Sequence, residues 1–364
     1  MRLSATLSLY LGRQFLGGIV LIFCCMLALV FLFDVIELLR RSAGREDADF
    51  AIIMQMALLN LPTLAQKLLP FAALFGGLMT YSRLTKSNEL IVTRAAGVSV
   101  WQFLAPGLAI ALLIGIFQIT VFNPVAAVMI AKYEQLEARF LEGRQSLLAV
   151  SGTGLWLRQA DEFGQSVIHA QRVSSAGTEL QKVIIFLYKG ADEFVGRIDA
   201  ESAVLHEGYW ALNDVLLTRP DEAATREPTY KLRTSLTLEQ IQDSFASPET
   251  LSFWSLPKFI LTLEAAGFSA VRHRLYWHAT LATPLLLCAM VLLAATFSLR
   301  LTRRRYTGLL IAVGVMAGFL LYFVSDVVFA LGIAGNLPVV LAAWTPTGVS
   351  TMFGLALLFH LEDG

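Results

Sequence analysis

Charged residues are distributed very unevenly along this chain of 364 residues, and their distribution limits the possible folds more than any other feature. Of the 28 basic and 28 acidic residues, 34 lie between Ala126 and Leu275, although that stretch is less than half of the chain. The flanking parts contain long uncharged apolar runs, which raise the mean hydropathy to +0.64. This pattern excludes a single soluble globule, a disordered chain and a collagen-like fibre. The sequence therefore predicts an integral membrane protein with one inserted aqueous domain.

Six apolar segments are long enough to cross about 30 Å of hydrocarbon as helices, which takes about 20 residues each. We predict them at residues 15–33, within 51–81, and at 98–122, 277–299, 307–331 and 337–359. The first is too long for a signal peptide, and no small-x-small cleavage site precedes Asp34, so we expect an uncleaved anchor. With the N-terminus inside, nine Lys and Arg residues fall in cytoplasmic segments, as the positive-inside rule requires. We therefore expect both termini in the cytoplasm and the charged stretch outside.

The chain then divides into residues 1–125 with three spans, an outer domain at 126–275, and residues 276–364 with three further spans. In the outer domain, Tyr230, Leu232, Thr234, Leu236 and Leu238 alternate with polar residues, which is the period of a half-buried strand. Further strand-like runs cover 155–158, 166–173, 183–188, 196–205 and 209–218, separated by glycine and proline turns. This spacing indicates an all-β, open jelly-roll-like domain. Residues 125–143 look helical, and a second short helix is expected after Ser255.

Several kinds of chemistry are not expected of this chain. It has no G-x-x-x-x-G-K-[ST] phosphate-binding loop, and its five histidines are scattered. The three cysteines lie in apolar runs, where cysteine usually serves as a small hydrophobe. A net charge of zero argues against a nucleic-acid partner. We therefore predict no catalytic residue, no metal site and no cofactor in this chain.

The loop between the second and third spans carries one acid, Glu89, among Arg83, Lys86 and Arg94. Ser87 or Asn88 could cap a short helix there, with Leu90, Ile91 and Ala95 on one side and Gly97 at its end. Two interpretations remain open. The loop could be a turn at the membrane surface, where its basic residues meet anionic headgroups. It could equally dock a protein partner that pairs with the single acid.

The stretch Asn88–Gly97 resembles the coupling-helix signature of the lipopolysaccharide export permeases, the LptF/LptG family. The resemblance covers nearly the whole chain, with six spans and a β-rich domain between the third and fourth. Further matching motifs are Pro70-Phe71-Ala72-Ala73-Leu74, Asn123-Pro124, Gly152-Thr153-Gly154-Leu155-Trp156 and Tyr322…Asp326. Details of the first span and of the Asp326 region favour the LptG type over the LptF type.

This resemblance implies a permease of an ATP-driven lipopolysaccharide exporter in the bacterial inner membrane, with the central domain in the periplasm. Its partners would be a paralogous six-span permease of LptF type, an LptB-type ATPase dimer, a single-span jelly-roll partner of LptC type and an LptA-type periplasmic bridge. ATP would be used by the ATPase, which fits the missing phosphate-binding loop. Coupling to that ATPase would fall to Glu89, Leu90, Arg94 and Gly97.

The resemblance also points to residues that would contact lipopolysaccharide. Arg40, Arg41 and Arg45 lie at the outer mouth of the first span, where arginine suits bidentate contact with a phosphorylated headgroup. Asp34 departs from the family pattern, which has a basic residue there. Lys67 and Asp326 are ionisable residues inside spans, where each costs at least about 2.5 kcal/mol, so we expect them to face a cavity or a partner. Leu232 and Leu236 would point into the jelly roll, toward acyl chains.

Alternatives remain open at this stage. The arginine-rich mouth could be a solvated loop balanced by nearby acids. The chain could be a permease for another lipid or a lipoprotein, although such permeases usually have four spans with the large domain after the first. It could also be a membrane scaffold without transport, which predicts a sealed helix bundle.

Overall fold

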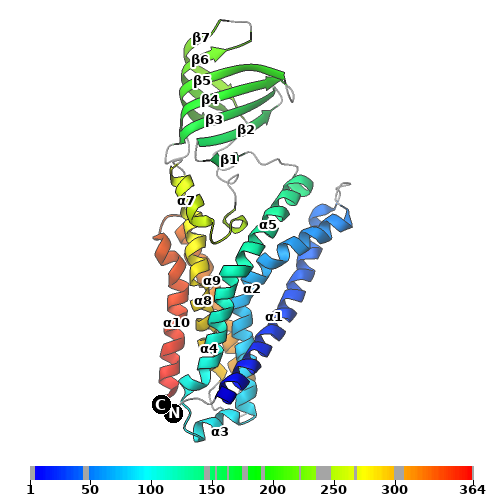
Figure 1. The fold of residues 1–364 in the computed structure, drawn as a ribbon, viewed down its shortest axis with the longest axis vertical. Coiled ribbons are helices and arrows are strands. Elements are labelled where there is room, and N and C mark those ends of the chain that lie inside the picture. Colours follow the sequence, from blue (N-terminus) through cyan, green and yellow to red (C-terminus); the bar gives the residue numbers. More distant parts are fainter. Residues whose placement is uncertain are drawn as a thin grey trace. The chain divides into compact units, whose positions relative to one another are not determined.

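The computed structural model describes residues 5–43, 49–142, 148–151, 154–161, 164–173, 179–189, 193–220, 223–234, 247–265, 269–298 and 307–362. The chain forms two compact units, which Figure 1 shows as a set of long helices and a curved sheet. The helical unit comprises Met1–Leu141, Glu249–Trp254 and Arg274–Gly364. The β unit comprises Glu142–Pro248 and Ser255–His273.

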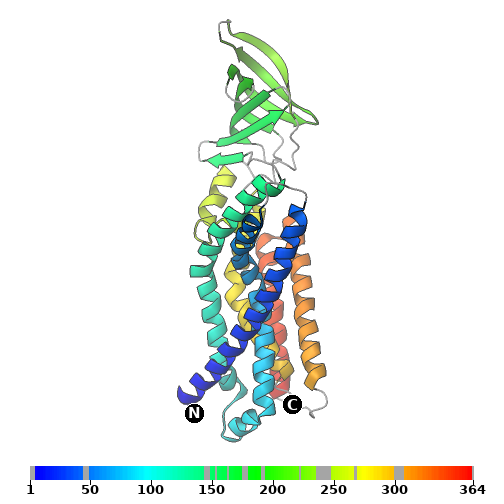
Figure 2. The same ribbon diagram turned by 90° about the vertical axis from the view of Figure 1, so that its right-hand side faces the viewer.

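The prediction of six membrane-spanning helices is confirmed, because six helices within the described residues are long and apolar enough to cross a bilayer. The chain is therefore a multi-pass membrane protein. The helical unit begins with α1, α2 and the short α3. The first residues of α1 and the last residues of α10 lie on the same side of this unit as α3 (Figures 1 and 2). The bounds are α1 Ala5–Ser42, α2 Phe50–Lys86, α3 Glu89–Ala95, α4 Val100–Phe117, α5 Asn123–Glu137, α8 Val271–Ser298, α9 Thr307–Ile333 and α10 Val339–Glu362.

The third span is longer than its sequence pattern predicts. A π-helical turn, η1 (Gln118–Phe122), joins α4 to α5, and a second, η2 (Ala138–Glu142), extends α5, so one apolar helix runs over Val100–Leu141. Pro124 lies in the first turn of α5, where a missing backbone N–H is tolerated, and the wide π turn before it keeps the helix continuous. As a result α5 belongs to the helical unit, whereas the sequence pattern assigns residues from 126 onward to the outer domain.

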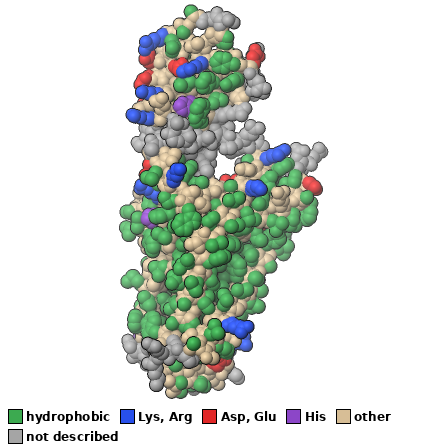
Figure 3. Space-filling model, viewed as in Figure 1, with side chains coloured by type: hydrophobic (Ala, Val, Ile, Leu, Met, Phe, Trp, Pro, Cys, Tyr) green, Lys and Arg blue, Asp and Glu red, His purple; other side chains and the backbone are tan. Residues whose placement is uncertain are grey.

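The core of the helical unit is built where α1, α2, α4 and α8 pack together. Phe15, Leu74 and Phe103 are among its fully buried side chains. The backbones of α1 and α2 come close at Gly18 and Gly76, since a Cβ on Gly76 would lie 2.7 Å from Ile19 Cα. Most of the surface of this unit that Figure 3 shows is hydrophobic, with charged side chains near its two ends. This surface is typical of a protein whose solvent is lipid.

In the part of the β unit that the structure describes, seven strands form an antiparallel sheet in which each strand pairs with the next along the chain. Its buried face includes Leu155, Ile168, Ile185, Ile198 and Trp210, whereas intervening residues point away, as the two-residue period of a strand requires. The prediction of an inserted all-β domain is thus confirmed, and its connectivity is a meander. The strands are β1 Leu148–Ser151, β2 Gly154–Asp161, β3 Gly164–Val173, β4 Glu179–Lys189, β5 Glu193–His206, β6 Tyr209–Thr218 and β7 Thr225–Arg233.

Two local predictions for this unit have different outcomes. The helix expected after Ser255 is confirmed as α7 (Leu256–Ala265), which buries Leu256, Ile260 and Leu263. The sequence alternation predicts a strand over residues 230–238, but β7 begins at Thr225 and ends at Arg233. Pro228 interrupts the alternation, but among the described strands β7 pairs with β6 alone, and an edge strand tolerates proline because its outer side has no hydrogen-bond ladder to complete. Leu236 and Leu238 lie outside the described residues.

Candidate functional site

The short helix predicted after Asn88 is present as α3, and one side of it is embedded in the bundle. Leu90 is almost fully buried and belongs to the main helical core. Ile91, Val92 and Arg94 are exposed. The sequence expectation that Ile91 lies on the same side as Leu90 is therefore wrong, because only one side of a seven-residue helix faces the bundle. The exposed side presents two β-branched apolar side chains beside one cation.

Asn88 occupies the N-cap position of α3 with a left-handed backbone (φ 62°), and its side chain makes no capping hydrogen bond. The Ser87 hydroxyl instead donates to the Glu89 carboxylate, with 2.8 Å between Oγ and Oε1. The second carboxylate oxygen of Glu89 accepts a hydrogen bond from the Tyr10 hydroxyl on α1 at 3.0 Å. Glu89 is thus only partly exposed, and both its oxygens have partners within the helical unit.

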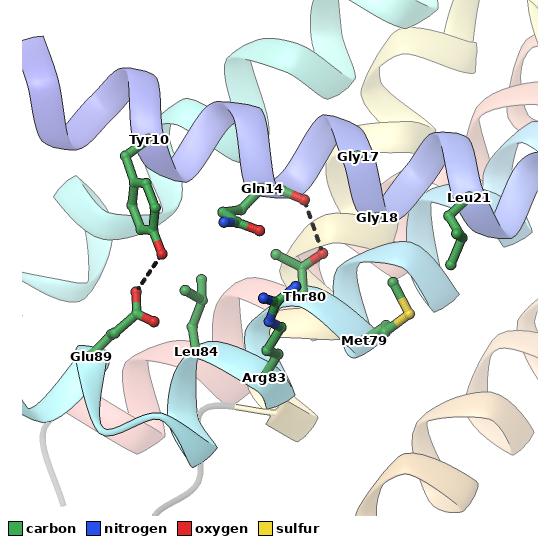
Figure 4. Close-up of a pocket in the computed structure, with 10 residues that line it drawn as sticks. All are labelled: Tyr10, Gln14, Gly17, Gly18, Leu21, Met79, Thr80, Arg83, Leu84 and Glu89. Carbon is green, nitrogen blue, oxygen red and sulfur yellow. Dashed lines mark hydrogen bonds between the residues drawn. The ribbon is translucent and has the colours of Figure 1, made fainter.

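A cavity of about 260 Å³ lies between α1 and α2 beside this carboxylate (Figure 4). Its polar end is formed by Tyr10, Gln14, Arg83 and Glu89, and the Thr80 hydroxyl approaches the Gln14 carbonyl oxygen at 3.5 Å. Its other lining residues are Gly17, Gly18, Leu21, Met79 and Leu84. α3 therefore faces this cavity on its α1 side, whereas on the opposite side its own Leu90 packs into the helical core.

Gly97 ends α3 in the way that glycine commonly ends a helix. Its φ is +82°, and the Gly97 and Val98 amides donate to the carbonyl oxygens of Arg94 and Thr93. This pair of bonds is the Schellman motif, which requires a left-handed residue after the helix. A Cβ on Gly97 would meet nothing within 4 Å, so backbone conformation alone requires glycine here.

The far end of α1 carries the predicted arginines, and each of the two described ones pairs with an acid. Arg40 forms two hydrogen bonds of 2.8 Å with Glu37 on its own helix. The Arg41 guanidinium lies 2.6 Å from the Glu137 carboxylate of α5. Arg45 lies outside the described residues. Asp34, one to two turns earlier, accepts a hydrogen bond from the Asn60 side chain of α2 at 3.1 Å.

The two ionisable residues predicted inside spans have different surroundings. Lys67 on α2 lies 3.3 Å from Glu249, an acid of the short Glu249–Trp254 segment that belongs to the helical unit. Asp326 is exposed on α9, next to the exposed apolar side chain of Val327. It forms no ion pair with any residue that the structure describes. An unpaired carboxylate on an exposed apolar helix indicates a surface that is not simply lipid-facing.

In the β unit, Leu232 is half-buried on the edge strand β7 and is in register with the buried Trp210 of β6. Its neighbours Lys231 and Arg233 are exposed, so the predicted alternation holds at these three positions. Two hydrogen bonds of 2.8 and 2.7 Å join Arg226 of β7 to Asp214 of β6 and hold the pKa of that carboxyl below its usual range. The predicted inward residue Leu236 is outside the described residues.

Tyr10 is not among the residues predicted from the sequence, and Asn123 is named there only as part of the Asn123-Pro124 motif. Tyr10 precedes the first apolar run, so nothing in the pattern linked it to Glu89, 79 positions later. Asn123 is fully buried, donates to the Tyr276 hydroxyl at 3.3 Å and accepts from the Phe253 amide at 2.8 Å. A polar residue beside proline at the end of an apolar run was the one available signal for it.

Comparison with known proteins gives a consistent result. The family model described as "Lipopolysaccharide export system permease LptF/LptG" matches residues 9–360. The protein named "Lipopolysaccharide export system permease protein LptG" from Haemophilus influenzae is 25% identical, over 94% of this chain and 95% of that protein. The protein of the same name from Escherichia coli K12 is 24% identical, over 96% of this chain and 97% of that protein.

Proposed function

Because the chain belongs to the LptF/LptG family of lipopolysaccharide export permeases, we propose that it is the LptG-type subunit of an ATP-driven exporter in the inner membrane. In this proposal it takes lipopolysaccharide from the outer leaflet and passes it to a periplasmic jelly-roll bridge. The observation that supports the proposal most strongly is the extent of the family match. It includes all six long helices, α3 and the β unit.

The proposed energy source is a separate LptB-type ATPase dimer that docks on α3. The exposed side chains of Ile91, Val92 and Arg94 offer an apolar surface with one cation, and Glu89 lies beside them. A partly desolvated acid in a partner's groove can cost several kcal/mol when its charge is reversed, far more than the roughly 1 kcal/mol of a surface ion pair. These features support a docking helix with Glu89 as its principal charged contact.

The proposed substrate path begins at the far end of α1 and continues in the β unit. Arg40 and Arg41 offer guanidinium groups to headgroup phosphates, in competition with their present carboxylate partners. Leu232 belongs to the apolar face of the sheet, which suits acyl chains. A paralogous LptF-type permease would pair with the helical unit in the membrane, and an LptC-type single-span protein and an LptA-type bridge would extend the sheet surface.

The test is purification of the tagged chain from its native membrane, followed by identification of the bound proteins and reconstitution into phospholipid nanodiscs. We expect a second six-span permease and an ATPase to co-purify, and lipopolysaccharide to stimulate ATP hydrolysis. A complex whose ATPase responds to a different lipid or to a lipoprotein would replace the proposed cargo. A chain that purifies without any ATPase would contradict the proposal and favour a scaffold.

A further inference from the structure

A hydrogen bond between Tyr10 and Glu89 connects α1, which contacts the lipid in the proposed function, with α3, which docks the ATPase. Tyr10 lies near the start of α1, and its hydroxyl donates to Glu89 Oε2 of α3 at 3.0 Å. Figure 4 shows the two side chains pointing toward each other across the gap between these helices. Ser87 donates to the other carboxylate oxygen at 2.8 Å, so the carboxylate is held from both sides. The orientation of Glu89 therefore depends on where α1 lies.

α1 is one continuous helix of 38 residues, with Arg40 and Arg41 in its last turn. At 1.5 Å per residue, Tyr10 and Arg40 are about 45 Å apart along its axis. α1 contains no proline to kink it, and its backbone hydrogen bonds run along the whole helix, so movement of one end is carried to the other. A displacement of the arginine end of α1 therefore changes the position of Tyr10.

The backbones of α1 and α2 are in close contact at Gly18 and Gly76, and a cavity separates the two helices elsewhere. A Cβ on Gly18 would lie 3.0 Å from the Gly76 carbonyl oxygen, and a Cβ on Gly76 would lie 2.7 Å from Ile19 Cα. Tyr10 is eight residues, or about 12 Å, from this crossing. Along the same interface, a cavity of about 260 Å³ extends from Glu89 past Gln14 and Arg83 as far as the crossing at Gly18. The crossing can act as a pivot, and the cavity leaves space for α1 to rotate about it.

We propose that Tyr10 is a positioning residue that holds the Glu89 carboxylate and transmits movements of α1 to α3, with the Gly18–Gly76 crossing as the pivot. This inference rests on the proposed function, in which α1 contacts the lipid and α3 docks the ATPase. Tyr10 itself touches neither partner in this scheme. Loss of its hydroxyl leaves the charge of Glu89 and the exposed side of α3 in place, so docking is retained while its response to the lipid weakens.

The test uses the complete exporter in nanodiscs, with Tyr10→Phe as the variant, since it removes one oxygen atom. Tyr81→Phe is the matched control, because the Tyr81 hydroxyl is buried and has no hydrogen-bond partner among the described residues. Two quantities are measured: ATPase bound per permease, and the ratio of lipopolysaccharide-stimulated to basal hydrolysis. For Tyr10→Phe we expect unchanged binding and a ratio lowered about three- to tenfold, the range that the net contribution of a typical hydrogen bond gives. Tyr81→Phe should match the wild type in both.

A second variant tests the same link from the other side. Glu89→Asp keeps the carboxylate but shortens the side chain by one methylene, so that it no longer reaches Tyr10. It should lower the stimulation ratio as Tyr10→Phe does, and the double variant should be no worse than either single one. An unchanged ratio in Tyr10→Phe, additive losses in the double variant, or loss of ATPase binding in Tyr10→Phe would each overturn the inference. A wild-type complex without ATPase, or without stimulation by lipopolysaccharide, would instead contradict the proposed function on which the inference rests.

Discussion

The Arg41 guanidinium of α1 lies 2.6 Å from the Glu137 carboxylate of α5, whereas its neighbour Arg40 pairs, among the described residues, with Glu37 of the same helix. The Arg40 side chain is 76% exposed and the Arg41 side chain 38%. The two adjacent arginines therefore differ in role. Arg41 links α1 to α5, whereas the exposed guanidinium of Arg40 is accessible to a phosphate group at the end of α1.

We predict that replacing Arg40 and Arg41 together with Ala weakens loading of lipopolysaccharide about fivefold or more, since two guanidinium contacts to phosphate are lost. Loading is measured as lipopolysaccharide bound per purified complex, and complex assembly should be unchanged. Glu137→Gln is the control, because it removes the ionic attraction between α1 and α5 at this contact but leaves both arginines charged. Loading that falls equally in Glu137→Gln and in the double variant would assign the effect to helix packing, and unchanged loading in the double variant would indicate a solvated loop.

Glu89→Lys should release or uncouple the ATPase, because it reverses a charge that we expect to be partly desolvated in the complex. The variant also removes the acceptor of the Tyr10 and Ser87 hydrogen bonds. The measurement is ATPase co-purified per permease, with membrane insertion followed in parallel. Glu201→Lys provides a matched charge reversal at an exposed position of β5 and should leave the amount of ATPase bound per permease unchanged. Wild-type binding and coupled turnover in Glu89→Lys would show that this acid is only a solvated loop residue.

Gly97→Ala should weaken ATPase binding severalfold by straining the end of α3. The added methyl meets nothing within 4 Å, so its effect comes from the φ of +82°, which costs an L-residue about 1–2 kcal/mol. Gly348→Ala in α10 adds a methyl to equally open space with ordinary helical backbone, and we expect it to have no effect on binding. Equal behaviour of the two variants in a binding titration would exclude a backbone requirement at Gly97.

Gly76→Ala should lower the thermal unfolding midpoint of the purified permease by several degrees. Its Cβ would press on the backbone of α1 at Ile19, which cannot move aside as a flexible side chain could. Overpacking of this kind costs about 1–3 kcal/mol. Gly348→Ala again provides the comparison. A midpoint equal to that of the wild type would mean that α1 is not held against α2 at this crossing.

Several features of the fold could be predicted from the sequence because they depend on local patterns. The six apolar runs are long enough to identify spans, and Gly97 and Ser255 mark helix ends by known chemistry. The helix limits were not predictable, since α1 continues for about ten residues on either side of its apolar run at 15–33. A helix leaving the membrane keeps its backbone hydrogen bonds, although its composition changes.

The features that were missed depend on contacts between distant parts of the chain. Tyr10 and Glu89 are 79 positions apart, and neither belongs to a repeating pattern that would bring them together. The exposure of Ile91 follows from which side of α3 Leu90 anchors, and this is decided by the bundle rather than by α3. β1 has only four residues, which is too short for alternation to be recognised.

In the proposed function, lipopolysaccharide contacts the apolar face of the β unit during transport. The most direct test places a photo-crosslinking amino acid at Leu232, which is in register with the buried Trp210, or at the exposed neighbour Lys231, in the reconstituted exporter. We predict ATP-dependent crosslinking of lipopolysaccharide at Leu232 and little or none at Lys231. Equal crosslinking at both positions, or crosslinking at Leu232 that does not depend on ATP, would contradict the claim.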